Sequence, residues 1–141
     1  MALLVLFTEP YCATFSGMDD VVVLHLPLKA DAELRAVDAL DRLLARHRVE
    51  SRAAGQARFA LVEACLNAIE YGTDEVDVRL AIYRGELRMT VHNPGTAPAP
   101  KPEPRTDRRG HGLRIIHSFM DRVRFHSDAG GTRVEMTKRV A

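Results

Sequence analysis

The chain has 141 residues and a formal net charge of +1, with 46% apolar and 28% charged residues. This length suits one domain around one core, and the composition is that of a globular protein rather than a disordered or fibrous one. The nearly neutral charge argues against a broad nucleic-acid-binding surface. The only cysteines, Cys12 and Cys65, lie far apart, so we expect free thiols in a reducing cytoplasm rather than a disulfide or a metal site.

Residues 1–18 are expected to form an N-terminal extension. The apolar start, Met1–Phe7, lacks a basic leader region and is too short to cross a bilayer. A strand is the preferred interpretation and a secretory signal the second, and no other run approaches the length of a membrane span. The segment after Pro10 is loop-like, which leaves three roles open: an edge strand, a dimer arm or a mobile extension.

A strand and a helix are expected next. Val21–Leu26 is rich in β-branched residues and is bounded by acidic residues and a proline, which predicts a strand. Asp31 is expected to cap a helix that runs from about Ala32 to Arg46. The residues at helical spacing that should form its apolar face are Leu34, Val37, Leu40 and Leu44, with Leu43 beside them.

The longest predicted helix runs from a Ser51 cap to Gly72, which is expected to end it in a left-handed conformation. Its predicted apolar stripe consists of Phe59, Val62, Leu66 and Ile69. Glu63 and Asn67 are one turn apart, so they project side by side from another face. The carboxylate could activate a hydroxyl or a water, and the amide oxygen suits Mg²⁺. The alternative is an ordinary solvated helix edge.

Four further strands are expected in two hairpins. Val76–Tyr83 alternates apolar and polar residues, and a tight turn at Arg84–Glu86 leads into a second strand that reaches His92–Gly95. A short helix is expected from Leu113 to about Met120. The last hairpin should pair a strand over residues 121–126 with one over residues 132–140. Five strands and three helices in this order predict an α/β (α+β) two-layer sandwich with a mostly antiparallel sheet and helices on one face.

A proline-rich segment, residues 96–109, separates the two hairpins. It carries four prolines at alternate positions and then three arginines, so it can neither pack a core nor pair as a strand. Long loops of this kind in compact domains are usually functional or disordered.

Three short motifs follow the long helix, and each has a plain structural alternative. Asn93-Pro-Gly95 ends a strand where a polar side chain can face a pocket, although it is also turn chemistry. Gly110-His-Gly112 can offer backbone N–H groups to phosphate at a helix start, or can be a flexible entry to that helix. Gly130-Gly-Thr132 can place a hydroxyl near a ligand, or can be a hairpin turn.

The order and spacing of these motifs resemble the GHKL ATPase superfamily, and within it the histidine-kinase-like ATPases of the anti-sigma-factor serine kinase type. The resemblance runs from about Val21 to the C-terminus, so the ATPase domain is expected over residues 19–141. Leu61–Gly72 is similar to the family's N box, Gly110–Asp121 to its second glycine box and following helix, and Gly130–Val134 to its closing strand.

The resemblance implies a Bergerat-type site for ATP and Mg²⁺. Glu63 would polarise the attacking hydroxyl or water as the catalytic residue, and Asn67 would be the metal ligand. Residues 96–109 would form the lid over the nucleotide, with an arginine such as Arg109 near the γ-phosphate. The implied nucleotide contacts come from Asn67, Asn93, Gly95, Arg109, Gly110, Gly112 and Thr132.

Asn93 departs from the family pattern, which has an aspartate that accepts a hydrogen bond from the adenine amine. An asparagine can still accept through its carbonyl oxygen, but it also brings an NH₂ group to a position that favours acceptors. A donor left facing a donor costs roughly 1–3 kcal/mol, which is about one to two decades in affinity. Tyr71 stands where relatives often carry a histidine.

Two hypotheses about function follow from these residues. The first is a small cytoplasmic regulator that binds Mg·ATP, sequesters a sigma factor or similar partner, and phosphorylates a serine or threonine of an antagonist (anti-anti-sigma) protein. The second is a non-catalytic partner-switching module whose nucleotide binding is weakened or lost. The resemblance also implies a homodimer through the outer face of the sheet, and it implies neither nucleic-acid nor membrane binding.

Overall fold

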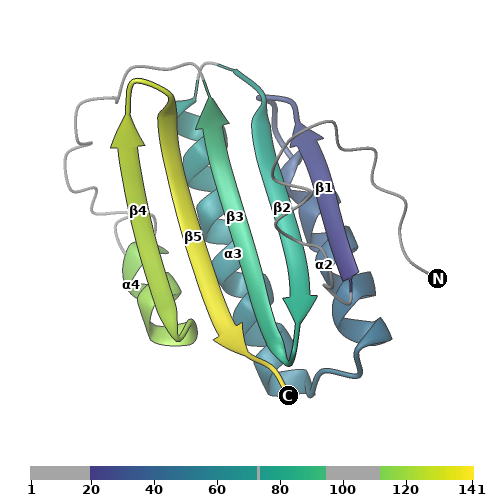
Figure 1. Ribbon diagram of the computed structural model, residues 1–141. Coiled ribbons are helices and arrows are strands. Elements are labelled where there is room, and N and C mark those ends of the chain that lie inside the picture. Colours follow the sequence, from purple (N-terminus) through teal and green to yellow (C-terminus); the bar gives the residue numbers. More distant parts are fainter. Residues whose placement is uncertain (1–19, 73, 95–111) are drawn as a thin grey trace.

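The computed structural model describes residues 20–72, 74–94 and 112–141. These residues form five strands and three helices (Figure 1). In chain order the elements are β1 (Asp20–Leu26), α2 (Glu33–Arg46), α3 (Ser51–Tyr71), β2 (Val76–Tyr83), β3 (Glu86–Pro94), α4 (Gly112–Phe119), β4 (Arg122–Asp128) and β5 (Gly131–Arg139). The predicted extension over residues 1–18 and the predicted lid over residues 96–109 lie outside the described residues.

The strands form one sheet in the order β1-β2-β3-β5-β4, and every neighbouring pair is antiparallel. All three helices lie on the same face of this sheet (Figure 1). The predicted two-layer α+β sandwich is therefore confirmed. The two hairpins lie side by side because β5, rather than β4, pairs with β3.

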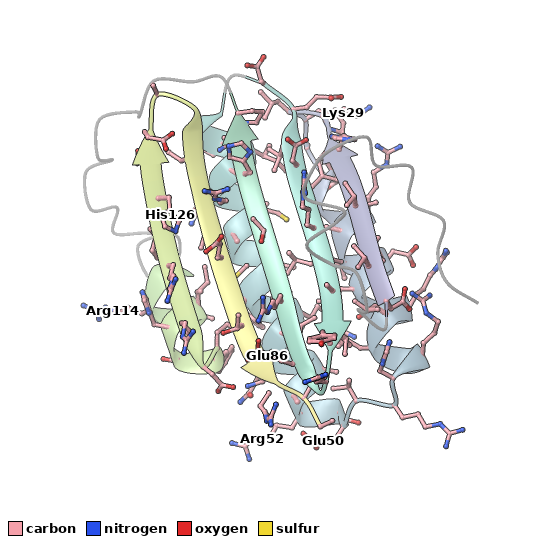
Figure 2. All side chains as sticks on the ribbon, viewed as in Figure 1. Lys29, Glu50, Arg52, Glu86, Arg114 and His126 are labelled. Carbon is pink, nitrogen blue, oxygen red and sulfur yellow. The ribbon has the colours of Figure 1, made fainter. Side chains whose placement is uncertain are left out.

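The alternation of side chains along the strands explains which face carries the helices. On β2, Val76, Val78 and Leu80 are fully buried, and on β3 Leu87 and Met89 are fully buried as well. Because successive residues of a strand point to opposite faces, the polar residues between them lie on the outer face. Figure 2 shows Glu86 of β3 and His126 of β4 among these outward side chains.

The start of α2 differs from the sequence prediction. Asp31 does not cap the helix, since it has a left-handed backbone with φ of 68° and Ala32 occupies the capping position without a side-chain hydrogen bond. The first helical N–H groups bond instead to backbone carbonyls, with Leu34 N donating to Asp31 O at 3.1 Å. Leu34 is 57% exposed, so its prediction as a core residue was wrong. The residues of α2 that are buried are Ala36, Leu40, Leu43 and Leu44.

The buried face of α3 also differs from the predicted stripe. Phe59 is 52% exposed and packs edge-to-face on Phe119 of α4, with ring centroids 6.0 Å apart. The residues of α3 that are buried are Ala57, Ala60, Leu61, Glu63, Ala64, Cys65 and Ala68. Small side chains on this face let the helix approach the sheet closely, because packing in a core is limited by side-chain volume. Of the rest of the predicted stripe, Ile69 is partly buried against the core, and Val62 and Leu66 are half-buried.

Both predicted ends of α3 need correction. Glu50, rather than Ser51, is the N-cap, and its side chain accepts a hydrogen bond from Ala53 N at 2.8 Å. Gly72 ends the helix with an extended backbone (φ −83°, ψ 162°), not in the predicted left-handed conformation. Its N–H still donates to Ala68 O at 2.9 Å.

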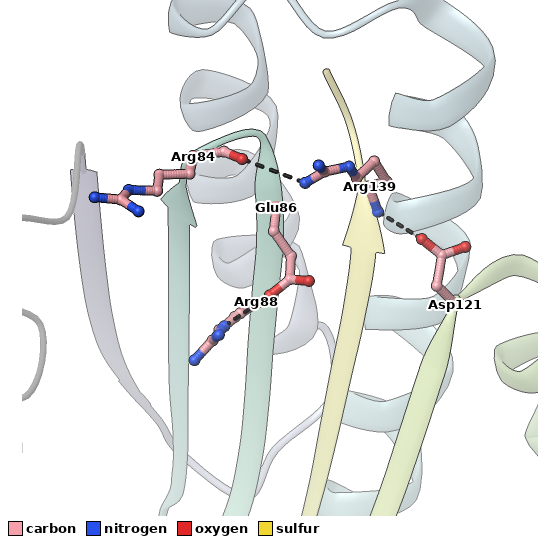
Figure 3. A network of polar contacts seen from close by, with 5 residues as sticks. All are labelled: Arg84, Glu86, Arg88, Asp121 and Arg139. Atoms are coloured by element: carbon pink, nitrogen blue, oxygen red, sulfur yellow. Dashed lines mark hydrogen bonds and ion pairs between the residues drawn. The ribbon is translucent and has the colours of Figure 1, made fainter.

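The turn between β2 and β3 has the predicted position. Arg84 and Gly85 have positive φ angles of 49° and 77°, as a two-residue hairpin turn with right-handed strand twist requires. Polar contacts then fix the neighbouring strand ends (Figure 3). Arg139 donates through its backbone N to Asp121 Oδ2 at 2.6 Å and through Nη1 to Arg84 O at 3.4 Å, while Arg88 pairs with Glu86 at 3.0 Å.

Two leucines of α2 provide a matched test of the corrected helix face. Leu40 is fully buried and Leu34 is 57% exposed. We expect Leu40→Ala to lower the free energy of unfolding by about 2–5 kcal/mol, because it removes buried methyl groups and leaves a cavity. Leu34→Ala should change it by less than about 0.5 kcal/mol. Urea denaturation measures both, and equal losses would contradict the assignment of the buried face.

Candidate functional site

Glu63 is a buried acid in the middle of α3. It is 5% exposed, and within the described part of the chain its Oε2 atom has no hydrogen-bond partner. Leaving a buried acceptor without a partner costs about 1–3 kcal/mol, and more for a charged group. Asn67 lies one turn further along the helix and is half-buried. The predicted carboxylate and amide therefore sit side by side, and the carboxylate has an acceptor available for a ligand.

Asn93 is a second buried polar residue with an unmatched atom. It lies near the end of β3, is 6% exposed, and its Oδ1 atom has no hydrogen-bond partner among the described residues. The strand alternation places Asn93 on the helix-covered face, after the buried residues Met89 and Val91. Thr132 of β5 is its direct cross-strand partner and is half-buried. The structure thus brings together two residues that are 39 positions apart in the sequence, by subtraction of their residue numbers.

Gly72 brings the end of α3 against Asn93. A Cβ atom at residue 72 would lie 2.6 Å from Ala68 O and 2.7 Å from Asn93 Oδ1, which is too close for any side chain. The sequence interpretation missed this contact, because it assigned the glycine to a helix cap. The extended end of α3 and the end of β3 therefore enclose the Asn93 carboxamide.

Gly131 has a similar role on the other side of Asn93. Its φ angle is 110°, and a Cβ atom there would lie 1.8 Å from Asn93 O. Only glycine fits this approach of β5 to β3. The Gly-Gly-Thr motif is thus a hairpin turn, as its plain alternative proposed, and it also sets the position of Thr132 beside Asn93.

The remaining predicted site residues fall into two groups. Gly112 is the first residue of α4, and this helix packs on α3 through the pair Phe59 and Phe119. Gly95, Arg109 and Gly110 lie outside the described residues.

Cys65 lies between Glu63 and Asn67 in sequence, but it does not add a reactive group to the site. Burial, with a smaller contribution from the charge of Glu33, raises the pKa of its thiol to about 12. The thiol is therefore protonated at neutral pH and is a poor nucleophile. It is a free cysteine, as expected, whereas Cys12 lies outside the described residues.

The donor set fits a nucleotide with a divalent cation better than a bare metal ion. In the described ranges, no group of three or more His, Cys, Asp or Glu side chains is arranged to hold a metal. Mg²⁺ usually takes one or two protein oxygens together with substrate phosphates and water, so the Asn67 amide beside the Glu63 carboxylate is a sufficient protein contribution. None of the helices in these ranges combines the length and apolar character needed to cross a membrane.

The two-layer fold, with a polar face of α3 beside the end of β3, is that of the GHKL-type ATPases. Residues 26–138 match the family model described as the histidine kinase-like ATPase domain, and the chain belongs to this family. None of the curated proteins compared with the chain matches it.

Three solved structures have a similar fold. The RsbU and RsbW domains of Rv1364c from Mycobacterium tuberculosis share 22% identity over 85% of this chain, with a TM-score of 0.68, and the match covers 32% of that longer chain. The SiaB–SiaC complex from Pseudomonas aeruginosa shares 11% identity over 90% of this chain and 94% of the other, with a TM-score of 0.64. The histidine kinase domain of the blue-light activated histidine kinase EL346 from Erythrobacter litoralis shares 19% identity over 81% of this chain and 61% of the other, with a TM-score of 0.53.

Two glycines, Gly55 inside α3 and Gly72 at its end, provide a matched test of the packing around Asn93. Gly72→Ala would place a Cβ atom 2.6 Å from a backbone oxygen, so we expect it to destabilise the fold by about 1–3 kcal/mol. At Gly55, in the interior of α3, a Cβ atom would meet nothing within 4 Å. Gly55→Ala should therefore stabilise the protein by about 0.5–1 kcal/mol. Thermal denaturation measures both, and a neutral Gly72→Ala would refute the close approach.

Proposed function

We propose that this protein is a cytoplasmic regulator of the anti-sigma-factor serine kinase type, which binds Mg·ATP and phosphorylates a serine or threonine of an antagonist protein. The observation that carries the proposal is the pair of unmatched buried acceptors, Glu63 Oε2 and Asn93 Oδ1. Both lie on or beside α3, and both belong to motifs that the family uses for nucleotide. A ligand that donates to these acceptors would relieve the cost of their burial.

The spacing along α3 suits an extended nucleotide. Gly72 lies nine positions after Glu63 (72 − 63 = 9), and a helix rises about 1.5 Å per residue. The Glu63 carboxylate therefore lies about 13 Å along the helix axis from the glycine that contacts Asn93. With the base at Asn93 and Thr132, the phosphates would extend along the helix toward Asn67 and Glu63.

Each residue then has a simple chemical role. When bound, Mg·ATP supplies the phosphoryl group and the metal charge that neutralises it. Asn67 offers a hard oxygen ligand. Glu63 accepts the proton of the attacking hydroxyl or orients that hydroxyl, as a general base held in a buried position. Gly112 begins α4, so its backbone N–H is one of those that the helix itself leaves free for phosphate.

The proposed assignment to the anti-sigma-factor kinase type also suggests which proteins this chain binds. The structure that contains the RsbW domain and the SiaB–SiaC complex both have folds similar to that of this chain. For this chain we propose a sigma factor or an anti-anti-sigma protein as partner, with no role for nucleic acid or membrane. A homodimer is compatible with this assignment.

The alternative function is a partner-switching module that works by binding alone. Asn93 favours it, because this residue replaces the aspartate of the family pattern and would place an NH₂ group next to the adenine of a bound nucleotide. The intact Glu63 and Asn67 favour the kinase. The two functions differ in whether a γ-phosphate leaves the nucleotide, which gives each of them a separate test.

The first test is the affinity for nucleotide. We expect Mg·ATP at about 100 times its Kd to stabilise the wild type by about 2.7 kcal/mol, which is several degrees in Tm. Asn93→Asp should tighten ATP binding by about one to two decades, because it replaces an amide donor by an acceptor. Isothermal titration calorimetry is the measurement, since Asn93→Asp also changes the stability of the free protein. No binding at millimolar ATP by either protein would exclude the nucleotide site.

The second test is phosphoryl transfer. Glu63→Gln keeps the shape of the side chain but removes the base, so transfer from radiolabelled ATP to candidate antagonist proteins should fall by about 10²–10⁴-fold, with ATP affinity kept within about threefold. The control is Glu75→Gln, because Glu75 is an exposed glutamate beyond α3. If the wild type binds ATP but labels none of the candidate antagonists, the binding module replaces the kinase as the assignment.

A further inference from the structure

The two edge strands of the sheet, β4 and β1, differ in how many of their residues are exposed to solvent. The strand β4 pairs with β5 on one side, and within the described residues no strand pairs with its other side. Six of its seven residues are exposed, whereas only one of the seven residues of β1, the opposite edge, is exposed. An exposed edge strand is a template for pairing with another strand, and proteins usually protect such edges. β4 is thus the edge at which a partner strand can add.

Several side chains of β4 keep groups that are free to contact a partner, although His126 Nε2 lies 3.5 Å from Glu135 Oε1 of β5. Arg122 and Arg124 are exposed on the outer face and have no ion-pair partner among the described residues. Phe125 lies on the helix side, where it is 52% exposed and its ring centroid is 6.0 Å from that of His117 of α4. Asp128 uses Oδ1 to accept from Gly130 N at 2.8 Å, which leaves Oδ2 for another donor.

The sequence of β4 is complementary to itself when two copies run antiparallel with Phe125 opposite Phe125. In that register Arg122 of each copy faces Asp128 of the other, Val123 faces Ser127, and Arg124 faces His126, so the complementary charges are those of Arg122 and Asp128. The charged pairs fall on the outer face and the two phenylalanines on the helix side, so each face of one sheet continues into the same face of the other. Opposite charges and aromatic pairs across strands are both stabilising.

We propose that two copies of this protein pair through β4 in this register, and that they form one continuous sheet across a two-fold axis at Phe125. The interface is isologous, since the same strand contributes from both copies. Pairing removes the exposed edge and leaves only β1, of whose seven residues three are buried, three half-buried and one exposed, at the two ends of the joined sheet. This surface differs from the outer sheet face that the family resemblance implies for a dimer, and it does not depend on nucleotide binding.

The neighbouring registers are less favourable. A shift of two residues in one direction puts Arg124 opposite Arg124, and like charges directly across strands are destabilising. The opposite shift puts His126 on the axis and pairs Arg124 with Asp128, but it moves Phe125 against Ser127 and leaves Arg122 beyond the partner's strand. Shifts by one residue would pair an outer-face side chain with a helix-side one. Both the Phe125 and the His126 registers contain Arg–Asp pairs, and the Phe125 register is favoured because it also pairs the two phenylalanines and overlaps all seven residues of the strand.

The first experiment measures the association state by sedimentation velocity over a range of concentrations. Arg122→Asp places an acid opposite Asp128, so we expect the dimer Kd to rise at least about tenfold. The charge-swapped double variant Arg122→Asp/Asp128→Arg restores both pairs and should return the Kd to within about threefold of the wild type. The control is Arg114→Asp, an equal change of charge at an exposed arginine of α4 that projects from the side of the molecule (Figure 2).

The second experiment locates the axis by cross-linking, in a Cys12→Ser background so that the buried Cys65 is the only other thiol. Opposite residues of antiparallel strands have Cα atoms about 4.5–5.5 Å apart, which a disulfide can span. Phe125→Cys should therefore form a disulfide-linked dimer under mild oxidation. Ser127→Cys is the control, because its copies would be about four residues, or roughly 13 Å, apart along the strands.

A monomer at all concentrations up to the millimolar range would overturn the proposal. So would a dimer whose Kd is unaffected by Arg122→Asp, or one that is cross-linked equally at residues 125 and 127. Circular dichroism and Tm of each variant show whether it is folded. Because the cross-link needs no charge change in β4, it remains informative if Arg122→Asp fails to fold.

Discussion

The close approach of α3 to the sheet is the constraint on which the rest of the structure depends. Its buried face carries alanines, a cysteine and Leu61 rather than large residues, and its extended end at Gly72 lies against Asn93. A bulkier face would lift the helix from the sheet, because interiors are packed to crystal-like density. The same approach draws Glu63 into the interior, where it is 5% exposed. The packing of the core and the geometry of the site are therefore one feature.

This arrangement places polar groups where they reduce stability. Glu63 and Asn93 each keep a buried oxygen without a partner among the described residues. Such groups are rare in folded proteins and commonly mark sites with a function. In contrast, the buried residues of β2 and β3 around them are uniformly apolar. Asp20 Oδ1, at the start of β1, is a further acceptor of this kind. Glu63 and Asn93 differ from it in their position, because they lie on one face of α3 and near the end of β3, within the motifs predicted to bind a ligand.

The sequence predicted the architecture well, because strand alternation and turn chemistry are local signals. The hairpin at Arg84 and Gly85 is an example, since both its position and its left-handed backbone follow from a short polar turn between alternating strands. The buried face of α3 was not predictable in the same way. Alanine is only weakly hydrophobic, so the large residues such as Phe59 determined the predicted apolar face of the helix. The face that packs on the sheet consists mainly of small residues, because these let the helix lie close to the strands.

The site was predictable in part for a related reason. Glu63 and Asn67 are linked by helical spacing, which a sequence displays directly. The contact of Gly72 with Asn93 joins two elements across a hairpin and depends on how far α3 extends before its backbone straightens. The role of Gly131 depends similarly on which strand pairs with β3. Only the sheet order supplies that information, and so the sequence predicted Gly72 as the end of the helix but not its contact with Asn93.

The exposed edge and the proposed nucleotide site lie on different parts of the same sheet, and β5 connects them. This strand holds Thr132 beside Asn93 on one side, and on the other side it aligns β4 residue by residue. Ser127 of β4 is the direct neighbour of Thr132, and Phe125 is the neighbour of Val134. A displacement of β4 in a dimer could therefore reach Thr132 directly through the backbone hydrogen bonds between β4 and β5. Because interfaces and cores resist gradual deformation, such coupling requires two discrete arrangements of the strand. The rigid antiparallel register of β3, β5 and β4 favours one arrangement, so dimerisation and nucleotide binding should be energetically independent.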